Sequence, residues 1–313
     1  MEIRNIGKSG LRVSVVGLGC NNFGGRLDVE ATRKVVHRAI DAGITLFDTA
    51  DSYGNRGGSE TQLGEVLGAR RNEIVLATKF ASPMTDKSKE YVASRGYIMS
   101  AVEASLRRLQ TDWIDLYQLH WPDPRTPMEE TLRALDDLVR QGKVRYIGSS
   151  NLNAWQIADA AWISRHHRLA PFISAQNEFS LLVRDQSEPL LPALAEYGMG
   201  LLPYFPLGGG LLTGKYKKGQ PLPEGRLKST QNSASRFLTD LNWDLAEKLE
   251  RLASERGHSL IELAFGWLLA HDAVPSVIAG ATKPEQIDAN IAAANWRLSA
   301  EDRAAVGKLL DAG

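Results

Sequence analysis

Eight short apolar runs, separated by segments with helical spacing, are the feature that most constrains the fold of this chain. The runs are VSVVGLG, TLFDTA, EIVLATK, WIDLYQLH, KVRYIGSS, FISAQNE, GLLPYFP and PSVIAG. Strands that are apolar along their whole length suit a parallel sheet buried on both faces. Between them the 3.6-residue period is clear, as at Ile98, Val102, Leu106 and Leu109. Eight alternating units of this kind predict an α/β protein with a (β/α)8 TIM barrel.

The remaining segments are assigned around that barrel. MEIRNI and LRVS, joined through KSG, predict an N-terminal β-hairpin that plugs the barrel floor, and an extra helix is expected at the C-terminus. Residues 207–240 show no clear period and predict a long functional loop after the seventh strand. No linker interrupts the pattern, so we expect one barrel domain over residues 1–313.

One helix is marked at both ends by residues that favour caps. Thr126, Pro127 and Glu129 are expected at its N-cap, N1 and N3 positions, and Gly142 is expected to end it in the left-handed conformation.

Composition excludes several classes of partner. The 313 residues carry 37 basic and 37 acidic side chains without a basic tract, so we predict neither a nucleic-acid nor a membrane partner. The lone Cys20 excludes an intramolecular disulfide and a cysteine-rich zinc site, and no metal site is predicted. The first residues are charged where a signal peptide is apolar, and no apolar run is long enough to span a bilayer. We therefore expect a soluble cytoplasmic protein, whose oligomeric state no pattern indicates.

Four polar side chains lie at, or just after, the ends of separate strand-like runs: Asp48, Tyr53, Lys79 and His120. The C-terminal ends of parallel barrel strands meet at one mouth, where such barrels collect their chemistry. Lys79 can favour the anion of Tyr53, a weak acid with an ordinary pKa of about 10, while Asp48 keeps the lysine protonated. A neutral His120 can donate a hydrogen bond to a carbonyl oxygen. Any one of them alone could simply cap a helix or pair with a neighbour, but together they predict a proton-transfer site.

Two common nucleotide motifs are absent. Asn22 stands where a dinucleotide fingerprint needs glycine, and no GxxxxGK[ST] occurs. After the eighth strand, Gly280, Thr282 and Lys283 introduce a helix whose backbone amides and lysine could hold an anion. An ordinary capping box formed by Thr282 and Glu285 explains the same residues equally well.

The segments that carry these residues resemble the aldo-keto reductase family, and the resemblance covers nearly the whole chain. GITLFDTADSYGNRGGSE contains Asp48 and Tyr53, IVLATKF contains Lys79, and IDLYQLHWPD contains His120. KVRYIGSSN, SAQNEFSLL, PYFPLGGGLLTGKY and IAGATKPEQIDAN are similar to the family's cofactor segments in the same order. The resemblance implies reduction of aldehydes and ketones to alcohols by hydride transfer from NADPH. Tyr53 would then be the general acid, and His120 would orient the carbonyl group.

The resemblance also implies a set of cofactor contacts. They are Cys20, Asn21, Asp48, Ser150, Asn151, Gln176, Tyr204, Pro206, Leu207, Gly209, Lys215, Gly280, Thr282, Lys283, Gln286 and Asn290. Tyr204 would stack on the nicotinamide ring. Lys283 would meet the 2′-phosphate, which favours NADPH without excluding NADH, and Arg226 or Arg236 could add a second phosphate contact. Ala289 departs from the family, since relatives often carry an acidic adenine contact there.

The substrate is predicted only as a small carbonyl compound. Phe23, Tyr53, His120 and Trp121 are expected to line its pocket. One alternative is an NADPH-binding regulatory subunit like the potassium-channel β subunits, although those tend to carry asparagine at the position of His120. Another alternative is a lyase with Lys79 as a Schiff-base nucleophile, which needs a neutral amine that Asp48 opposes.

Overall fold

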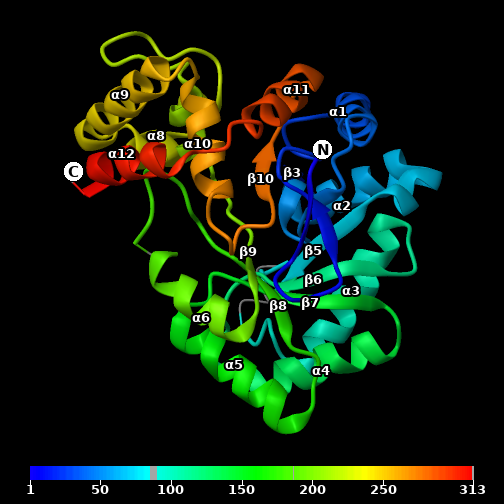
Figure 1. The fold of residues 1–313 in the computed structure, drawn as a ribbon. Coiled ribbons are helices and arrows are strands. Elements are labelled where there is room, and N and C mark those ends of the chain that lie inside the picture. The colour runs from blue at the N-terminus through cyan, green and yellow to red at the C-terminus, as the bar shows by residue number, and fades with distance from the viewer. Residues whose placement is uncertain (85–89, 186, 312–313) are drawn as a thin grey trace.

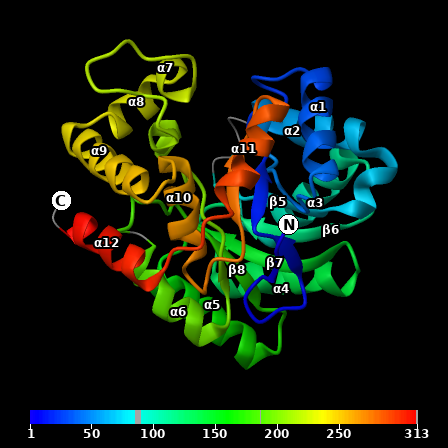
Figure 2. The ribbon, with the colours of Figure 1, turned by 45° about the horizontal axis from the view of Figure 1, so that its top comes forward.

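The predicted barrel is present in the computed structural model, which describes residues 1–84, 90–185 and 187–311 (Figures 1 and 2). Its eight strands are β3 (Val16–Gly19), β4 (Leu46–Asp48), β5 (Val75–Phe80), β6 (Ile114–Leu119), β7 (Val144–Ser150), β8 (Phe172–Gln176), β9 (Gly200–Leu201) and β10 (Val277–Gly280). All paired neighbours are parallel, in the order β10-β3-β4-β5-β6-β7-β8-β9. The amide of Ile278 donates to the carbonyl of Pro203 (3.4 Å), which draws the two edges of the sheet together.

Helices surround this sheet (Figure 2). They are α1 (Val29–Asp41), α2 (Tyr53–Leu67), α3 (Arg95–Leu109), α4 (Met128–Arg140), α5 (Ala154–His167), α6 (Leu191–Tyr197), α7 (Arg226–Ser229), α8 (Gln231–Phe237), α9 (Asp240–Glu255), α10 (Leu260–Leu269), α11 (Pro284–Ala293) and α12 (Ala300–Asp311). Short 3-10 turns are η1 (Gly68–Glu73), η2 (Glu188–Leu190) and η3 (Gly208–Thr213). The apolar faces of the helices and the outward side chains of the strands form the main core. The expected extra C-terminal helix is α12, which packs on α9. Within the described part of the chain, none of these helices has the length and apolar character needed to cross a bilayer.

The N-terminal hairpin closes one end of the barrel, as predicted. Strands β1 (Ile3–Asn5) and β2 (Arg12–Ser14) pair antiparallel, and Ile6, Leu11 and Val13 pack against inward side chains of the barrel strands. Leu46, the first residue of β4, belongs to this cluster, so the hairpin lies at the N-terminal ends of the strands. The opposite end of the barrel is left for chemistry.

The start of helix α4 differs from the prediction by one residue. Pro127, expected at N1, is the N-cap with an extended backbone (ψ 136°), and the helix begins at Met128. The Thr126 hydroxyl, expected to cap the helix, instead donates to Asp123 Oδ2 (2.8 Å). Gly142 takes the predicted left-handed conformation (φ 74°) just beyond the helix.

Residues 207–240 are more ordered than the missing period suggested. They contain η3, α7 and α8, which bury Leu211, Tyr216, Leu227 and Phe237 in a separate cluster against α9. Each helix here has four to seven residues, which is too short for an amphipathic period to be visible in the sequence.

Candidate active site

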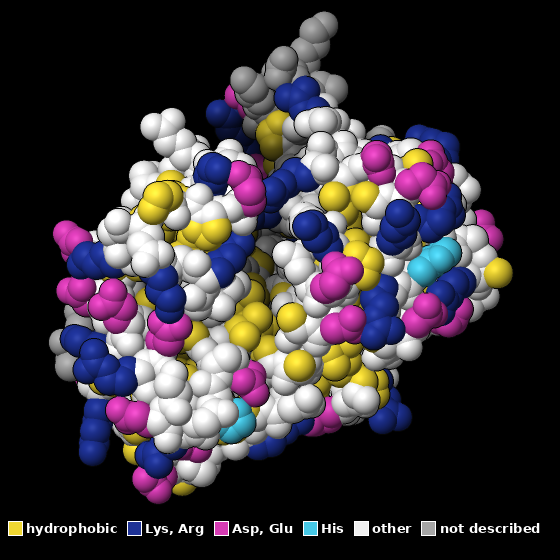
Figure 3. Space-filling view, turned by 90° about the horizontal axis from the view of Figure 1, so that it is seen from above, with side chains coloured by type: hydrophobic (Ala, Val, Ile, Leu, Met, Phe, Trp, Pro, Cys, Tyr) yellow, Lys and Arg dark blue, Asp and Glu magenta, His cyan; other side chains and the backbone are white. Residues whose placement is uncertain are grey.

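The four predicted side chains meet at the C-terminal mouth of the barrel. Asp48 ends β4, Lys79 lies near the end of β5, His120 follows β6, and Tyr53 is the first residue of α2. The strand register brings Lys79 beside Gln118 of the neighbouring strand. Figure 3 views this end of the molecule and shows a hollow at its centre, with Lys and Arg side chains around it.

Lys79 is the centre of the group. Its ammonium is fully buried and donates to Asp48 Oδ2 (2.7 Å), to the carbonyl of Thr49 (2.8 Å) and to the Tyr53 hydroxyl (3.4 Å). The other Asp48 oxygen accepts from the amides of Gln118 (3.2 Å) and Gln176 (2.8 Å). Because both oxygens of Asp48 are occupied, the carboxylate and the ammonium hold each other in one geometry.

Burial and neighbouring charges act in opposite directions on the pKa of Lys79 and on that of Tyr53. Burial lowers the pKa of the Lys79 ammonium, but Asp48 and Tyr53 outweigh burial, so the net direction is upward and the amine stays charged. For Tyr53, burial raises the pKa, and Lys79 opposes the rise without reversing it. Tyr53 is therefore a protonated phenol near neutral pH, with a cation in contact that eases its ionisation.

His120 is neutral. Burial, aided by the nearby Lys79 charge, lowers its pKa to about 3. Its Nδ1 lies 3.1 Å from the Ser82 hydroxyl, and its ring lies edge-on to Tyr53 with centroids 5.8 Å apart. Within the described residues no hydrogen-bond partner occupies Nε2, which leaves that nitrogen for a ligand. A neutral imidazole beside a protonated phenol can grip one carbonyl oxygen from two sides.

A left-handed turn follows Tyr53 directly. Gly54, Asn55, Arg56 and Gly57 have φ values of 66°, 60°, 67° and 114°, so the regular helix starts only after them. A Cβ on Gly54 would lie 2.4 Å from the carbonyl oxygen of Phe23. The turn therefore sets the direction of the Tyr53 side chain, and Gly54 is required by both φ and space.

The predicted carboxamide contacts bond to one another here. The Asn151 amide donates to the carbonyl of His120 (2.9 Å) and to Ser150 Oγ (3.0 Å), and its oxygen accepts from the Tyr204 hydroxyl (2.9 Å). Ser150 Oγ donates to the carbonyl of Gln176 (2.7 Å). The structure thus brings Ser150, Asn151, Gln176 and Tyr204 together beside His120, as expected for neighbours in one site.

The predicted phosphate end lies at α11, and one part of its prediction was wrong. Gln286, not Glu285, turns back to the helix start, where Gln286 Oε1 accepts from the backbone amides of Thr282 (2.7 Å) and Lys283 (3.2 Å). Gln286 is therefore occupied as a cap, whereas the Lys283 side chain is exposed. Asn290 is buried within the same helix.

The other predicted cofactor residues lie around the mouth. A Cβ on Gly280 would be 3.5 Å from Asn21 Oδ1, so these two residues are neighbours. Pro206 and Leu207 lead directly into η3, which contains Gly209. Lys215 was predicted to contact the cofactor. In this structure its ammonium donates to the carbonyl of Glu224 within its own loop (3.0 Å).

The two aromatic side chains predicted to line the substrate pocket beside Tyr53 and His120 differ in exposure. Trp121 is 49% exposed and stacks on His120, with centroids 5.8 Å apart and an interplanar angle of 19°. Phe23 is fully buried in the main core, and its place in the substrate pocket stays a prediction. The Cys20 side chain is also fully buried, and burial raises the pKa of its thiol, so only its backbone could face a ligand.

Three neighbours of the site were missed from the sequence. Gln118 contacts Asp48, and Ser82 contacts His120. Asp51 is buried near Lys79, and among the described residues neither of its carboxyl oxygens has a hydrogen-bond partner. Gln118 had a visible signal, because it is an amide within an apolar run, two residues before His120 and on the same face of the strand. No pattern in the sequence marked Ser82 or Asp51 as a neighbour of the site.

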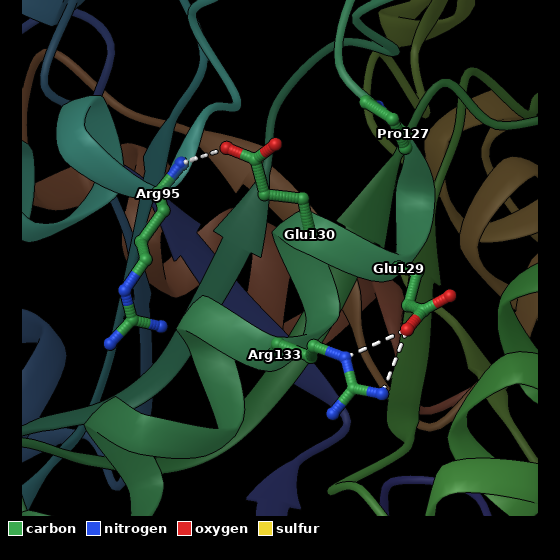
Figure 4. A pocket seen from close by; sticks show the side chains of 5 residues that line it. All are labelled: Arg95, Pro127, Glu129, Glu130 and Arg133. Atoms are coloured by element: carbon green, nitrogen blue, oxygen red, sulfur yellow. Dashed lines mark hydrogen bonds and ion pairs between the residues drawn. The ribbon is translucent and has the colours of Figure 1, made fainter.

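A separate surface hollow of about 320 Å³ lies on the outer helices (Figure 4). Its charged side chains are already paired, since Arg133 donates to Glu129 (2.8 Å) and Glu130 accepts from the Arg95 amide (2.9 Å). It contains none of the predicted chemistry. Over residues 1–84, 90–185 and 187–311, no group of three or more His, Cys, Asp or Glu side chains could hold a metal ion.

Comparison with known proteins agrees with this geometry. The family model described as "Aldo/keto reductase family" matches residues 15–311. A "Probable voltage-gated potassium channel subunit beta" of Oryza sativa subsp. japonica is 38% identical over 303 residues, covering 94% of this chain and 91% of that protein. The "L-glyceraldehyde 3-phosphate reductase" of Escherichia coli (strain K12) is 35% identical over 307 residues, covering 94% and 88%. An uncharacterised oxidoreductase of Bacillus subtilis (strain 168) is 36% identical over 311 residues, covering 96% and 93%. This chain, with its (β/α)8 barrel, belongs to the aldo/keto reductase family.

Proposed function

We propose that the protein reduces aldehydes or ketones to alcohols with NADPH, and that Tyr53 donates the proton. The observation that carries the proposal is the contact of one buried ammonium, Lys79 Nζ, with both Asp48 (2.7 Å) and the Tyr53 hydroxyl (3.4 Å). A structural ion pair would need only the first of these contacts. The second contact places the charge of Lys79 beside Tyr53, an acid at the mouth of the barrel.

The chain's own residues have distinct parts in this scheme. The neutral His120 donates a hydrogen bond to the carbonyl oxygen and fixes its direction, while Tyr53 delivers a proton to that oxygen as negative charge develops on it. Lys79 stabilises the phenolate that is left, and Asp48 keeps Lys79 charged. A bound nicotinamide would supply the hydride.

The residues around the mouth fit NADPH. Asn22 Oδ1 is buried without a partner among the described residues, and a Cβ on Gly280 would lie 3.3 Å from Asn22 Nδ2, so the two residues are neighbours. The exposed Lys283 at the start of α11 would hold the 2′-phosphate, with the Thr282 hydroxyl beside it. Tyr204 would support the nicotinamide ring, and the loop from Pro206 would follow the pyrophosphate.

The decisive experiment is NADPH oxidation, followed by absorbance, with 4-nitrobenzaldehyde as substrate. Tyr53→Phe should bind NADPH as the wild type does while turnover falls by a factor of about 100 or more. Turnover that is the same in wild type and Tyr53→Phe would refute the assignment of the acid.

A second candidate is an NADPH-binding regulatory subunit, since a relative in rice is named as a probable channel subunit β. Such a protein would bind NADPH and exchange it slowly, with negligible turnover over a broad aldehyde panel. The neutral His120 and the coupled Tyr53 and Lys79 favour the reductase instead. A Schiff-base lyase is disfavoured because its nucleophile would be neutral, and Asp48 keeps the buried Lys79 charged.

A further inference from the structure

We propose that Ser82 is a positioning residue for His120: its hydroxyl donates a hydrogen bond to Nδ1 and so keeps the imidazole proton on Nε2, the nitrogen left open for a ligand. The inference rests on the proposed reductase function, in which His120 donates a hydrogen bond to the carbonyl oxygen. It adds the residue that decides which ring nitrogen can donate and where that nitrogen lies.

The backbone just before Ser82 has an unusual conformation. Ala81, which follows β5 directly, is buried and has a φ of 69°, in the left-handed region that residues other than glycine rarely adopt. In a regular strand Ser82 would lie on the opposite face of the sheet from Lys79. The left-handed step at Ala81 breaks this alternation, and the Ser82 hydroxyl reaches His120, just beyond the end of β6. Such conformations persist only where the surrounding structure holds them, and they cluster at functional sites.

The backbones of Ser82 and His120 are both held in place by neighbours. The Tyr97 hydroxyl, on α3, donates to the carbonyl of Ser82 (2.8 Å). The His120 amide donates to the carbonyl of Phe80 (2.9 Å), and the His120 carbonyl accepts from the Asn151 side chain (2.9 Å). Ser82 and His120 are also both buried. The 3.1 Å contact between Ser82 Oγ and His120 Nδ1 therefore joins two fixed segments of the chain.

The direction of this hydrogen bond follows from the polar groups that are available. Among the described residues, the Ser82 hydroxyl has no hydrogen-bond partner besides His120 Nδ1. If Nδ1 carried the imidazole proton, Ser82 Oγ would accept it, and the buried serine proton would have no acceptor. If Nε2 carries the proton instead, the serine proton binds the lone pair of Nδ1 and no buried donor is left unpaired. The contact therefore selects the Nε2–H form of the neutral ring.

The same hydrogen bond distinguishes two orientations of the imidazole ring. Trp121 stacks on the ring with an interplanar angle of 19°, and Tyr53 meets it edge-on at 80°. These contacts define the plane of the ring, but a half-turn about the Cβ–Cγ bond keeps that plane and exchanges each nitrogen with a carbon. A partner specific to Nδ1 separates the two orientations. Without Ser82, part of the protein would present a C–H group where the carbonyl oxygen needs an N–H donor.

The first test locates the imidazole proton by a long-range proton–nitrogen correlation NMR spectrum of the isotope-labelled protein, in which protonated and bare ring nitrogens are well separated. The His120 signals are those missing from His120→Gln. We expect the proton on Nε2 in the wild type, and a shift of the bare Nδ1 signal in Ser82→Ala, where its hydrogen bond is lost. A proton on Nδ1 in the wild type, or His120 signals that do not change in Ser82→Ala, would overturn the proposal. The spectrum needs no turnover, so it decides the role of Ser82 independently of the reductase assignment.

The second test measures reduction of 4-nitrobenzaldehyde by NADPH. In Ser82→Ala, kcat should fall about ten-fold or more, while the dissociation constant of NADPH, from fluorescence quenching, stays within a factor of about two. Ser82→Thr keeps the hydroxyl and should recover most of the lost turnover. Ser100→Ala, which removes a serine hydroxyl from the exposed face of α3, is the matched control and should behave as the wild type. A wild-type kcat in Ser82→Ala would refute the positioning role, whereas a wild type without turnover would refute the reductase proposal alone.

Discussion

Replacing Asp51 with asparagine is expected to stabilise the protein, by an amount that grows as the pH rises from about 4 to about 8. The Asp51 side chain is 1% exposed, and neither carboxyl oxygen has a hydrogen-bond partner among the described residues. Burial, reinforced by the charge of Glu60, raises its pKa from 3.8 to about 8, although Arg108, the adjacent backbone amide of Ser52 and Lys79 oppose the rise. The folded protein therefore holds this acid neutral over a range in which the unfolded chain ionises it.

The sign and size follow from this difference in proton binding. Between the two pKa values the folded state binds one proton more than the unfolded state, so stability falls with rising pH by about 1.4 kcal/mol per pH unit. The loss of unfolding free energy that Asp51 causes is absent below about pH 4, reaches about 4 kcal/mol near pH 7 and is constant above about pH 8. An asparagine side chain at this position would be similar in size, cannot ionise and breaks no side-chain hydrogen bond of Asp51.

Urea unfolding of wild type and Asp51→Asn at about pH 5, 6, 7 and 8 measures the effect. The gap in unfolding free energy between the two proteins should widen steadily across this series. Asp159→Asn, on the exposed face of α5, is the matched control and should keep a constant gap. Parallel curves for wild type and Asp51→Asn would refute the reasoning, because they would mean that Asp51 titrates alike in both states.

Three further predictions concern the cofactor, the backbone and the pH profile. Lys283→Ala should weaken NADPH binding about ten-fold and NADH binding much less, measured by fluorescence quenching, because only NADPH carries the 2′-phosphate; equal weakening would contradict the assignment. Gly54→Ala should lower the unfolding free energy, measured in urea, by more than about 2 kcal/mol, because the new Cβ clashes with Phe23 and φ is unfavourable. Gly68→Ala is the control: its φ is 49° but no atom lies within 4 Å of the new Cβ, so it should cost only about 1 kcal/mol. The His120 imidazole, with its pKa of about 3, should show no protonation between about pH 5 and 8 in an NMR titration, and a midpoint near 6.5 would disprove its burial in the neutral form.

The parts of the fold that repeat were predictable from the sequence. Each of the eight apolar runs overlaps one barrel strand, because strands buried on both faces leave no polar alternation to obscure them. The positions of Asp48, Lys79 and His120 were predictable for a related reason. In a parallel barrel, the ends of all strands face the same mouth, so a polar residue at the end of an apolar run is directed there by topology alone.

The parts that depend on neighbours distant in sequence were not predictable. The Asp51 carboxyl is neutral because it is buried and lies near the charge of Glu60, and nothing near residue 51 in the sequence indicates that burial. Lys79 opposes the rise in the pKa of Tyr53, as its charge implies, but burial, whose depth only the packing determines, outweighs it. At α11, Glu285 and Gln286 were both chemically able to cap the helix start, and the one-residue shift of the cap selected Gln286.

Several ionisable side chains around the mouth are paired with an opposite charge or held neutral, so an unpaired cation there has a larger effect on the local field. Lys79 is matched by Asp48, Arg108 by Glu60 and Arg236 by Glu178, while Asp51 and His120 are neutral. Lys283 on α11 is exposed and has no carboxylate partner among the described residues. A chain with no net charge overall therefore still has an unmatched positive charge where, by our proposal, the anionic cofactor binds. If Asp51 carried its charge, a second carboxylate would stand near Lys79 and weaken that field, so the burial that costs stability also favours binding.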